Sequence, residues 1–309
     1  MTDCGRADCP LARPAPAHLE DGLAVHVCPA CGARRSPDAA ITQRAVLPDA
    51  EAQTPGAMRL LFRLREAWLR RTIPELANMG ARILDCGAGD GQWLEWLAQR
   101  GWQRLAAMET NPDRLARARA RGLAAFPSLA EAAATQEGGR FDIIFLWHVL
   151  EHVDRPVALV GELLDLLAPG GVLVVSQPNR TSLQTRLFGR RSAFVSYGHH
   201  LWFLDHASFA KLADSFPGVS IAALPDCNVE YEAFGWLDTL VSAALGEDNL
   251  LHATLKKGRV RGGRKWAVLA LALLALPLAA LLVPIALTIP KMGSTLTYCL
   301  RPQPSGPAR

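Results

Sequence analysis

Three closely spaced glycines after an apolar run form the segment of the chain with the clearest chemical meaning. Residues 81–93 read ARILDCGAGDGQW, in which the apolar run ends at Asp85 and an amphipathic segment begins at Trp93. The glycines are Gly87, Gly89 and Gly91. Glycine lets a ligand approach the backbone closely, and the first turn of a helix presents unpaired N–H groups. The pattern predicts a strand, a glycine-rich turn and a helix, which suit a nucleotide-like ligand or a plain tight turn.

An acidic residue after the next apolar run favours the ligand. This run begins at Leu105 and ends at Glu109. An acid about 20 residues beyond such a loop is placed to accept hydrogen bonds from ribose hydroxyls. The alternative is a solvated acid at the end of a strand.

A third segment carries a resemblance to a known family. Residues 141–153 read FDIIFLWHVLEHV, and residues 168–171 read APGG before another apolar run. Together with the glycine loop and Glu109, these segments resemble class I S-adenosylmethionine-dependent methyltransferases, in particular those that act on small molecules and lipids. Residues 200–205, HLWFLD, resemble the segment before the next helix of that family, so the resemblance covers residues 80–226.

The resemblance implies a fold and a cofactor. The fold is α/β, with a Rossmann-like sheet of seven strands, the final strand antiparallel, and helices on both faces. The cofactor is S-adenosylmethionine, with the glycine loop at its methionine end and Glu109 at its ribose. The implied cofactor-binding residues are Asp85, Gly87, Gly89, Gly91, Glu109, Leu146, Trp147 and His148. Residues 122–128 lack the acid that the family often has after its third strand, so the backbone or Ser128 is expected to recognise the adenine.

Histidines supply the candidate catalytic groups. If the acceptor is a hydroxyl, histidine is the natural base because its pKa lies near neutrality. The candidates are His200, His148, His152 and His199, with His200 first because it precedes an aromatic run near the expected acceptor side. His152 has the alternative role of capping or packing the following helix, and a carbon or nitrogen acceptor needs a different arrangement.

Cysteines near the N-terminus predict a metal site. The chain has seven cysteines, and two pairs lie within the first 31 residues: Cys4, Cys9, Cys28 and Cys31. Paired thiolates on two tight turns suit tetrahedral zinc, and so short and polar a segment needs a metal to fold. We predict a zinc-ribbon-like module at residues 1–33 with a structural zinc. The alternatives are a metal-free redox pair, a ribbon without metal, and His18 or His26 in place of one cysteine.

The composition is that of a large folded protein in a reducing compartment. The chain has 309 residues, 50% of them hydrophobic, and a formal net charge of +4, so it can bury a large core. Cys86, Cys227 and Cys299 stand apart in apolar surroundings and are expected to be buried and unbridged. The first four residues begin no apolar run, so we expect no secretory signal.

A linker and a helix, residues 34–79, precede the methyltransferase-like core, residues 80–227. Residues 34–55 are rich in proline, alanine and charge, which is typical of a linker. Residues 58–69 alternate apolar and basic groups with helical period. This helix is expected either to lie over the mouth of the cofactor site or to pack on the sheet.

A hydrophobic insertion follows the core at residues 228–290. Residues 266–289 carry no charge and are long enough for a membrane span of about 20 residues. A basic cluster directly precedes them: Lys256, Lys257, Arg259, Arg261, Arg264 and Lys265. Such a cluster is typical of the anionic cytoplasmic surface of a membrane. Residues 231–241 predict an amphipathic helix whose aromatics suit the same interface or ordinary packing.

The last unit, residues 291–309, argues against a simple span. Residues 294–301 have the pattern of a strand, and we expect them to pair antiparallel beside the fifth strand, with residues 218–226 as the sixth. Both ends of the hydrophobic segment then lie on the cytoplasmic side. Because Pro277 and Pro284 interrupt helical hydrogen bonding, we predict a re-entrant or interfacial helical hairpin. A full span and a buried core helix are the alternatives.

The sequence thus predicts a methyltransferase at the cytoplasmic face of the cell membrane, held there by residues 266–289. The expected acceptor is a lipid, a lipid-linked glycan or an isoprenoid-type compound, and the expected partners are lipids of the cytoplasmic leaflet. The alternatives are a non-catalytic cofactor-binding scaffold and a nucleic-acid methyltransferase. The intact loop with Glu109 disfavours the scaffold, and the absence of an N-P-P-[YF] motif disfavours nucleic acid.

Overall fold

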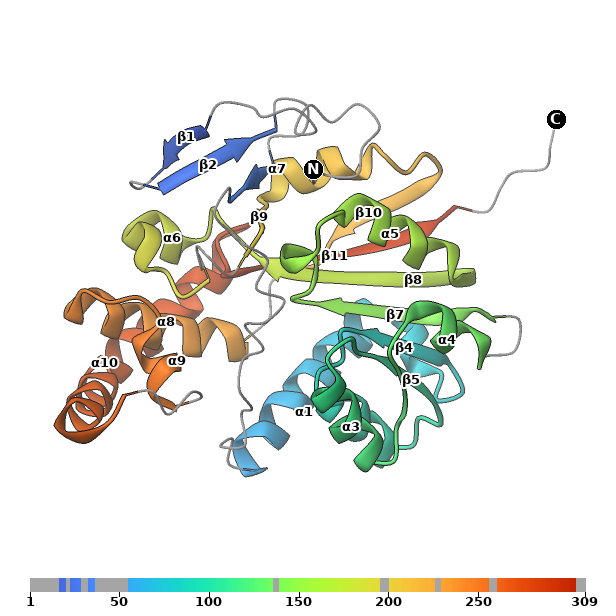
Figure 1. The fold of residues 1–309 in the computed structure, drawn as a ribbon, viewed down its shortest axis with the longest axis horizontal. Helices are drawn as coiled ribbons and strands as arrows, with labels where there is room; N and C mark the ends of the chain where they lie inside the picture. The colour runs from blue at the N-terminus through green and yellow to red at the C-terminus, as the bar shows by residue number, and fades with distance from the viewer. Residues whose placement is uncertain are drawn as a thin grey trace.

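The computed structural model describes residues 17–20, 23–28, 33–36, 55–135, 139–194, 200–225, 229–255 and 260–303 (Figure 1). The larger of its two sheets has the strand order β10-β11-β8-β7-β4-β5-β6. The parallel strands are β4 (Arg82–Cys86), β5 (Arg104–Met108), β6 (Ala124–Phe126), β7 (Phe141–Trp147) and β8 (Leu167–Pro178). Strand β11 (Thr295–Pro302) runs antiparallel between β8 and β10 (Val219–Ala223). The seven-stranded sheet and its antiparallel final strand beside the fifth are therefore confirmed.

Alternate side chains of the central strands pack into two hydrophobic cores, one on each face of this sheet. On β4, for example, Ile83 joins one core and Leu84 the other. Helices α1 (Pro55–Thr72), α2 (Gln92–Gln99) and α3 (Pro112–Ala120) contribute to the core of Ile83. Helices α4 (Leu129–Ala134), α5 (Pro156–Asp165) and α7 (His206–Ala213) contribute to the core of Leu84. The predicted helices on both faces are thus present. Short 3₁₀ helices lie at η2 (Pro74–Ala77), η4 (Leu150–His152) and η5 (Gly189–Arg191).

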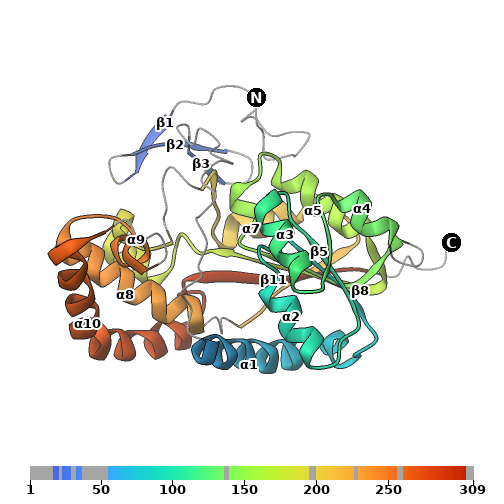
Figure 2. The ribbon, with the colours of Figure 1, turned by 60° about the horizontal axis from the view of Figure 1, so that its bottom comes forward.

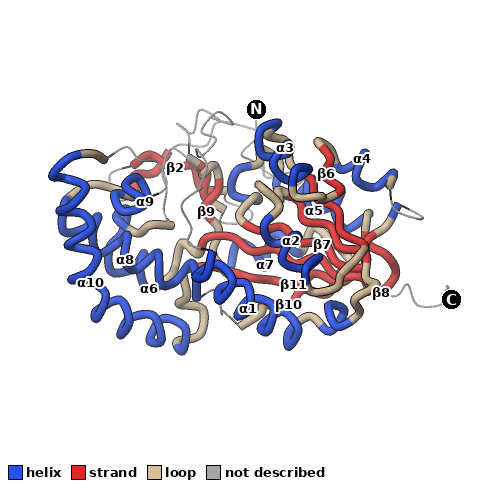
Figure 3. The backbone as a smooth tube through the Cα atoms, turned by 90° about the horizontal axis from the view of Figure 1, so that it is seen from below, coloured by secondary structure: helices blue, strands red, loops and turns tan. Residues whose placement is uncertain are grey.

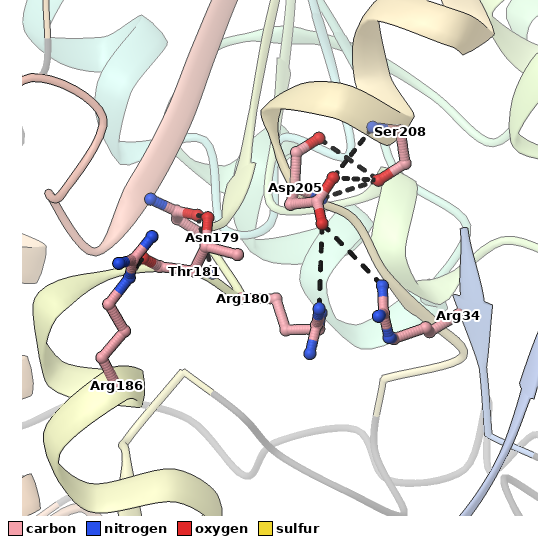
Figure 4. A network of polar contacts seen from close by, with 7 residues as sticks. All are labelled: Arg34, Asn179, Arg180, Thr181, Arg186, Asp205 and Ser208. Atoms are coloured by element: carbon pink, nitrogen blue, oxygen red, sulfur yellow. Dashed lines mark hydrogen bonds and ion pairs between the residues drawn. The ribbon is translucent and has the colours of Figure 1, made fainter. Parts of the chain in front are cut away.

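A small sheet joins the N-terminal segment to the core. It has the order β1 (Ala17–Glu20), β2 (Leu23–Val27), β3 (Arg34–Arg35) and β9 (Trp202–Phe203). Arg34 and Arg180 each lie 3.8 Å from Asp205, which caps α7 by accepting the backbone N–H of Ser208 (Figure 4). Residues 34 and 35 were expected to begin a linker, but they form a strand because β9 offers them a pairing edge.

The hydrophobic insertion forms one continuous helix, α10 (Gly262–Thr288), so the predicted hairpin within residues 266–289 is wrong. Pro277 and Pro284 lie inside the helix without ending it. The reason is lateral support from α8 (Val229–Leu245), which packs on both sides of Pro277. Val268 packs in one cluster with Val241 of α8, and Ala279 packs in another with Trp236. The chain leaves the sheet along α8 and returns along α10, with α6 (Leu183–Phe188) and α9 (Leu250–Leu255) beside this pair (Figure 1).

Most of the surface of α10 is exposed. By length and composition it is long and apolar enough to cross a membrane. Only 11% of its most apolar stretch is buried, whereas a core helix of the same composition would be mostly buried. Trp266, Leu273 and Leu274 are 69%, 67% and 76% exposed. The buried core helix that was an alternative for this segment therefore does not occur. Viewed from below, α10 and α1 lie on the same side of the molecule (Figures 2 and 3).

Candidate active site

The predicted glycine-rich turn connects β4 to α2, and its three glycines have φ angles of 81°, 57° and 77°. A Cβ on Gly87 would lie 2.3 Å from Val149, and one on Gly91 would lie 2.4 Å from Leu123. Packing therefore requires glycine at both positions. A Cβ on Gly89 would meet nothing within 4 Å. At Gly89 the backbone faces open space, which a ligand can approach.

Asp85, at the end of β4, is a buried acid beside this turn. Its side chain is 3% exposed, and its Oδ1 has no hydrogen-bond partner among the described residues. Burial raises the pKa of Asp85 to about 7; the guanidinium of Arg65 opposes this rise, and the negative charge of Glu109 adds to it. An acid with an unpartnered oxygen beside an open glycine fits the methionine end of S-adenosylmethionine, which carries an ammonium group.

Glu109 connects the end of β5 to the same turn. One carboxylate oxygen accepts the N–H of Gly89 at 3.0 Å, and the other accepts the N–H of Asn111 at 2.8 Å. The side chain is 7% exposed, so these bonds are largely shielded from water. The acid that was predicted at the ribose thus lies directly against the glycine loop.

Helix α1 packs on the core, as one of the two expectations for it requires, and it brings Arg65 near Asp85. Phe62 packs on Trp93 with ring centroids 5.7 Å apart. The guanidinium of Arg65 lies 5.5 Å from the ring centroids of Trp93 and Trp147, and it lowers the pKa of Asp85. Arg65 was not singled out in the sequence, because an arginine in an alternating basic and apolar helix carries no signal of its own.

The three residues at the end of β7 occupy different positions. Leu146 is fully buried in the hydrophobic core, and Trp147 is partly buried. His148 has a φ of 52°, a left-handed conformation that costs a residue with a side chain about 1–2 kcal/mol. Its ring stacks on Tyr231 of α8 at 4.2 Å, and its Nδ1 lies 3.3 Å from Glu151 Oε1. Such local strain is typical of functional sites.

The predicted catalytic histidines gather around one buried carboxylate, that of Glu151. The rings of His152 and His200 meet edge to face, with centroids 4.9 Å apart. Burial raises the pKa of Glu151, but the hydrogen bond with His148 and the fields of the three histidines prevail and hold that pKa at about 2. The carboxylate is therefore anionic. His199 lies outside the described residues.

Sequence reasoning missed two residues on this side of the site, Glu151 and Tyr231. Glu151 stands in the run HVLEH between two histidines, and this spacing could have indicated a carboxylate that contacts them. Tyr231 was assigned only to an interfacial helix, and its contact with His148 depends on tertiary structure. Ser128, proposed for the adenine, uses its hydroxyl to cap α4 by accepting the N–H of Glu131 at 3.2 Å.

The predicted zinc ligands fall mostly outside the described residues, which exclude Cys4, Cys9 and Cys31. Cys28, which directly follows β2, is fully buried, and its N–H donates to the carbonyl of Ala33 at 2.8 Å.

The cysteines outside that module behave as expected where they are described. Cys86 and Cys299 are buried and unbridged, and burial raises the pKa of Cys86 to about 12. Cys227 lies outside the described residues.

Known proteins resemble this chain over part of its length. A family model described as a methyltransferase domain matches residues 59–216, which are 158 of the 309 residues. The ubiquinone biosynthesis O-methyltransferase of Xanthomonas campestris pv. campestris (strain B100) is 33% identical over 132 residues, 41% of this chain and 55% of that protein. The chain thus spans about half the length of the curated relatives it matches.

Solved structures resemble the chain at lower identity. The plantazolicin methyltransferase BamL, in complex with a desmethylPZN analog and SAH, is 15% identical with a TM-score of 0.45, over 84% of this chain and 87% of that one. The [4+2]-cyclase SpnF is 17% identical with a TM-score of 0.46, over 83% and 85%. The family match covers more than half of the chain and includes the glycine loop, Glu109 and the histidine cluster. The chain therefore belongs to the methyltransferase domain family.

Proposed function

We propose that this enzyme methylates a lipid-soluble acceptor at the cytoplasmic face of a membrane: a lipid, a lipid-linked glycan or an isoprenoid-type compound. The observation that carries the proposal is the exposed apolar surface of α10, which leads directly into the strand that completes the catalytic sheet. Extensive exposed apolar surface is typical of a membrane contact. Among these acceptors, the name of the curated relatives favours an isoprenoid-type hydroxyl.

The same geometry supports an orientation in which α10 lies along the membrane surface. Its C-terminal end continues into β11, and near its N-terminal end Arg264 pairs with Glu247, which follows α8. The C-terminal end is therefore tied to the catalytic sheet, and the N-terminal end is paired with the segment that follows α8. On the same side, α1 exposes Leu60 and Leu64, 57% and 44% exposed, together with the basic Arg63. Apolar and basic side chains on one side suit an anionic lipid interface.

Within the site, the residues divide the work of methyl transfer. S-adenosylmethionine, when bound, supplies a methyl group activated by a positive sulfur. Asp85, the glycine loop and Glu109 hold the cofactor, and Trp147 shields it from water. A histidine accepts the proton of the acceptor hydroxyl; His200 is the first candidate, with His148 and His152 as the others. Alignment and exclusion of water account for most of the remaining catalysis.

We also propose a structural zinc at Cys4, Cys9, Cys28 and Cys31. The full burial of Cys28 supports this proposal. Elemental analysis of protein purified in reducing buffer without chelators tests it, and Cys28→Ser should lower the zinc content. Equal zinc in both proteins would reject this ligand set.

Labelled cofactor tests the acceptor. Membranes and the purified enzyme are incubated with methyl-labelled S-adenosylmethionine, and the organic and aqueous extracts are compared. Label in the organic extract supports a lipid-soluble acceptor. Label confined to water-soluble compounds, proteins or nucleic acid rejects it.

Flotation with vesicles containing phosphatidylglycerol tests the membrane contact. The double variant Leu273→Glu, Leu274→Glu should lose binding at least tenfold. The matched control is Met79→Glu, in the turn before β4, which replaces a side chain that is also exposed (46%) and packs near Gly101 rather than on α10. Equal flotation of the wild type and the double variant would exclude α10 as the contact.

The in-plane orientation needs its own test. In cells with a permeabilised outer barrier, Ser305→Cys should resist a membrane-impermeant thiol reagent until the inner membrane is opened, with the unmodified protein as background. Labelling before opening would mean that α10 spans the membrane.

A further inference from the structure

Glu151, His152 and His200 form a cluster that cofactor binding does not use. Their ligand atoms all lie within 4.8 Å of one another. Zinc bonds to nitrogen or oxygen are about 2 Å long, so ligands of one ion must lie within about 4 Å of each other. Small rotations of the side chains are enough to meet this condition.

The backbone fixes both sides of the cluster. The N–H of Leu201 donates to the carbonyl of Glu151 at 2.7 Å, and the indole N–H of Trp202 donates to the carbonyl of Val153 at 2.8 Å. These bonds hold the segment of His200 against the segment of Glu151 and His152. Ligands on segments that are already joined lose little freedom when an ion binds.

The Glu151 carboxylate is oriented but incompletely satisfied. Its Oε1 lies 3.3 Å from Nδ1 of His148, whose ring is held in turn by Tyr231. Its Oε2 is buried and has no hydrogen-bond partner in the described part of the chain. A buried carboxylate oxygen without a hydrogen bond is costly, and a cation bound to it would remove that cost. The alternative is that Glu151 serves only as an ion-pair partner for the histidines, in which case Oε2 keeps its place without a hydrogen bond.

We propose that Glu151, His152 and His200 bind a divalent transition-metal ion such as zinc. Two imidazoles and one carboxylate are a donor set that such ions take with a coordination position left open. His148 acts on this site by orienting Glu151, as an outer partner of a metal ligand. The cluster follows the C-terminal end of β7. The neighbouring strand β4 runs parallel to β7 and ends at the glycine loop, so the cluster and the loop lie at the same end of the strands.

The open coordination position suggests a role for the ion in catalysis. This role rests on the proposed hydroxyl acceptor. An ion-bound hydroxyl loses its proton more readily, and His148 is then the histidine left to accept that proton. The binding of the ion itself does not depend on the acceptor.

Cobalt(II) is the probe for this site. Full-length protein is freed of metal with a chelator and titrated with cobalt(II), while its absorption spectrum is recorded. Thiolate ligands add a strong near-ultraviolet band, which distinguishes the cysteine module from a site of nitrogen and oxygen ligands. We expect the wild type to bind cobalt at both sites and to show the thiolate band. In Cys28→Ser we expect a visible absorption without that band, which saturates at one ion per chain, and this variant is the background for the substitutions below.

Variants test the assignment. Glu151→Gln and His200→Ala should weaken this absorption at least tenfold, whereas His252→Ala, on the distant α9, should titrate like Cys28→Ser itself. Cofactor binding by calorimetry verifies that each variant is folded. Cys28→Ser protein without the nitrogen and oxygen spectrum, or cluster variants in this background that titrate like Cys28→Ser itself, would overturn the proposal. The titration needs no acceptor, so failure to find a lipid-soluble acceptor leaves its result standing.

Discussion

The cofactor side and the acceptor side of the active site are built in different ways. The cofactor side comes from β4, β5 and the turn between β4 and α2, where the carbonyl of Met108 accepts the N–H groups of Gly87 and Ala88 at 2.8 and 3.0 Å. The acceptor side joins three parts of the chain that are far apart in sequence: the end of β7, helix α8, and the segment that precedes β9. The first is a local structure, whereas the second exists only in the folded chain. Substitutions on the two sides should therefore have separable effects.

The largest effect is expected at Gly89. A side chain at this position enters open space in the structure, so Gly89→Leu should block the cofactor and weaken its binding at least 100-fold, or about 2.7 kcal/mol. Isothermal titration with S-adenosylmethionine measures the loss.

Gly170→Leu is the matched control for this change. Gly170 also has a positive φ (78°) and open space around it, but it lies near the N-terminal end of β8, at the end of the parallel strands opposite to the glycine loop. Both variants should lose about 1–2 kcal/mol of unfolding free energy from backbone strain, while only Gly89→Leu loses the cofactor. Equal cofactor affinities in the two variants would remove Gly89 from the site.

Glu109 should give the next largest effect. Glu109→Ala removes the acceptor of two backbone N–H groups, and each such bond to a charged group is worth about 1.5–3 kcal/mol. We expect cofactor affinity to fall about 10- to 100-fold because the loop loses its anchor. Glu131→Ala on α4 removes an exposed carboxylate and should leave affinity unchanged. A normal titration for Glu109→Ala would contradict the assignment.

Tyr231 tests the acceptor side alone. Tyr231→Ala removes the ring that stacks on His148, so label transfer to membrane extracts should fall about tenfold, which corresponds to about 1.4 kcal/mol. Cofactor affinity should stay within a factor of about two, a change of only about 0.4 kcal/mol. Equal losses in both measurements would show that the two sides are not separable.

The pH dependence of cofactor binding should report Asp85. Its pKa of about 7 in the folded protein lies above the ordinary value of 3.8, so ionisation of Asp85 destabilises the fold increasingly as pH rises from about 4 to 7. If the cofactor ammonium pairs with the ionised acid, affinity should rise severalfold with pH up to about 7, and it should fall again above about pH 8, where an α-ammonium group loses its proton. Calorimetry between pH 5.5 and 8.5 measures this profile.

Two variants sharpen the pH test. Asp85→Asn should flatten the rise in affinity because it removes the titrating group. Arg65→Met should move the rise to higher pH because the arginine lowers the pKa of Asp85. A profile in Asp85→Asn that matches the wild type would assign the titration to another group.

The sequence by itself determined the glycine turn, the acid that follows it and the strand pattern of residues 294–301. Residue types predict such features directly because they depend on neighbours within a few residues. The plan of the seven-stranded sheet, with β11 beside the fifth strand, was what the resemblance to a known family implied.

The tertiary structure alone decided the continuity of α10 and the composition of the acceptor side. Pro277 and Pro284 favour a break in an isolated helix, but contacts with Trp236 and Val241 of α8 support both halves of α10. Likewise, Arg65 lies on Trp147, and Glu151 meets His200, only because separate elements pack at one edge of the sheet. Contacts between distant segments depend on how packing orients whole elements, which local residue patterns do not specify.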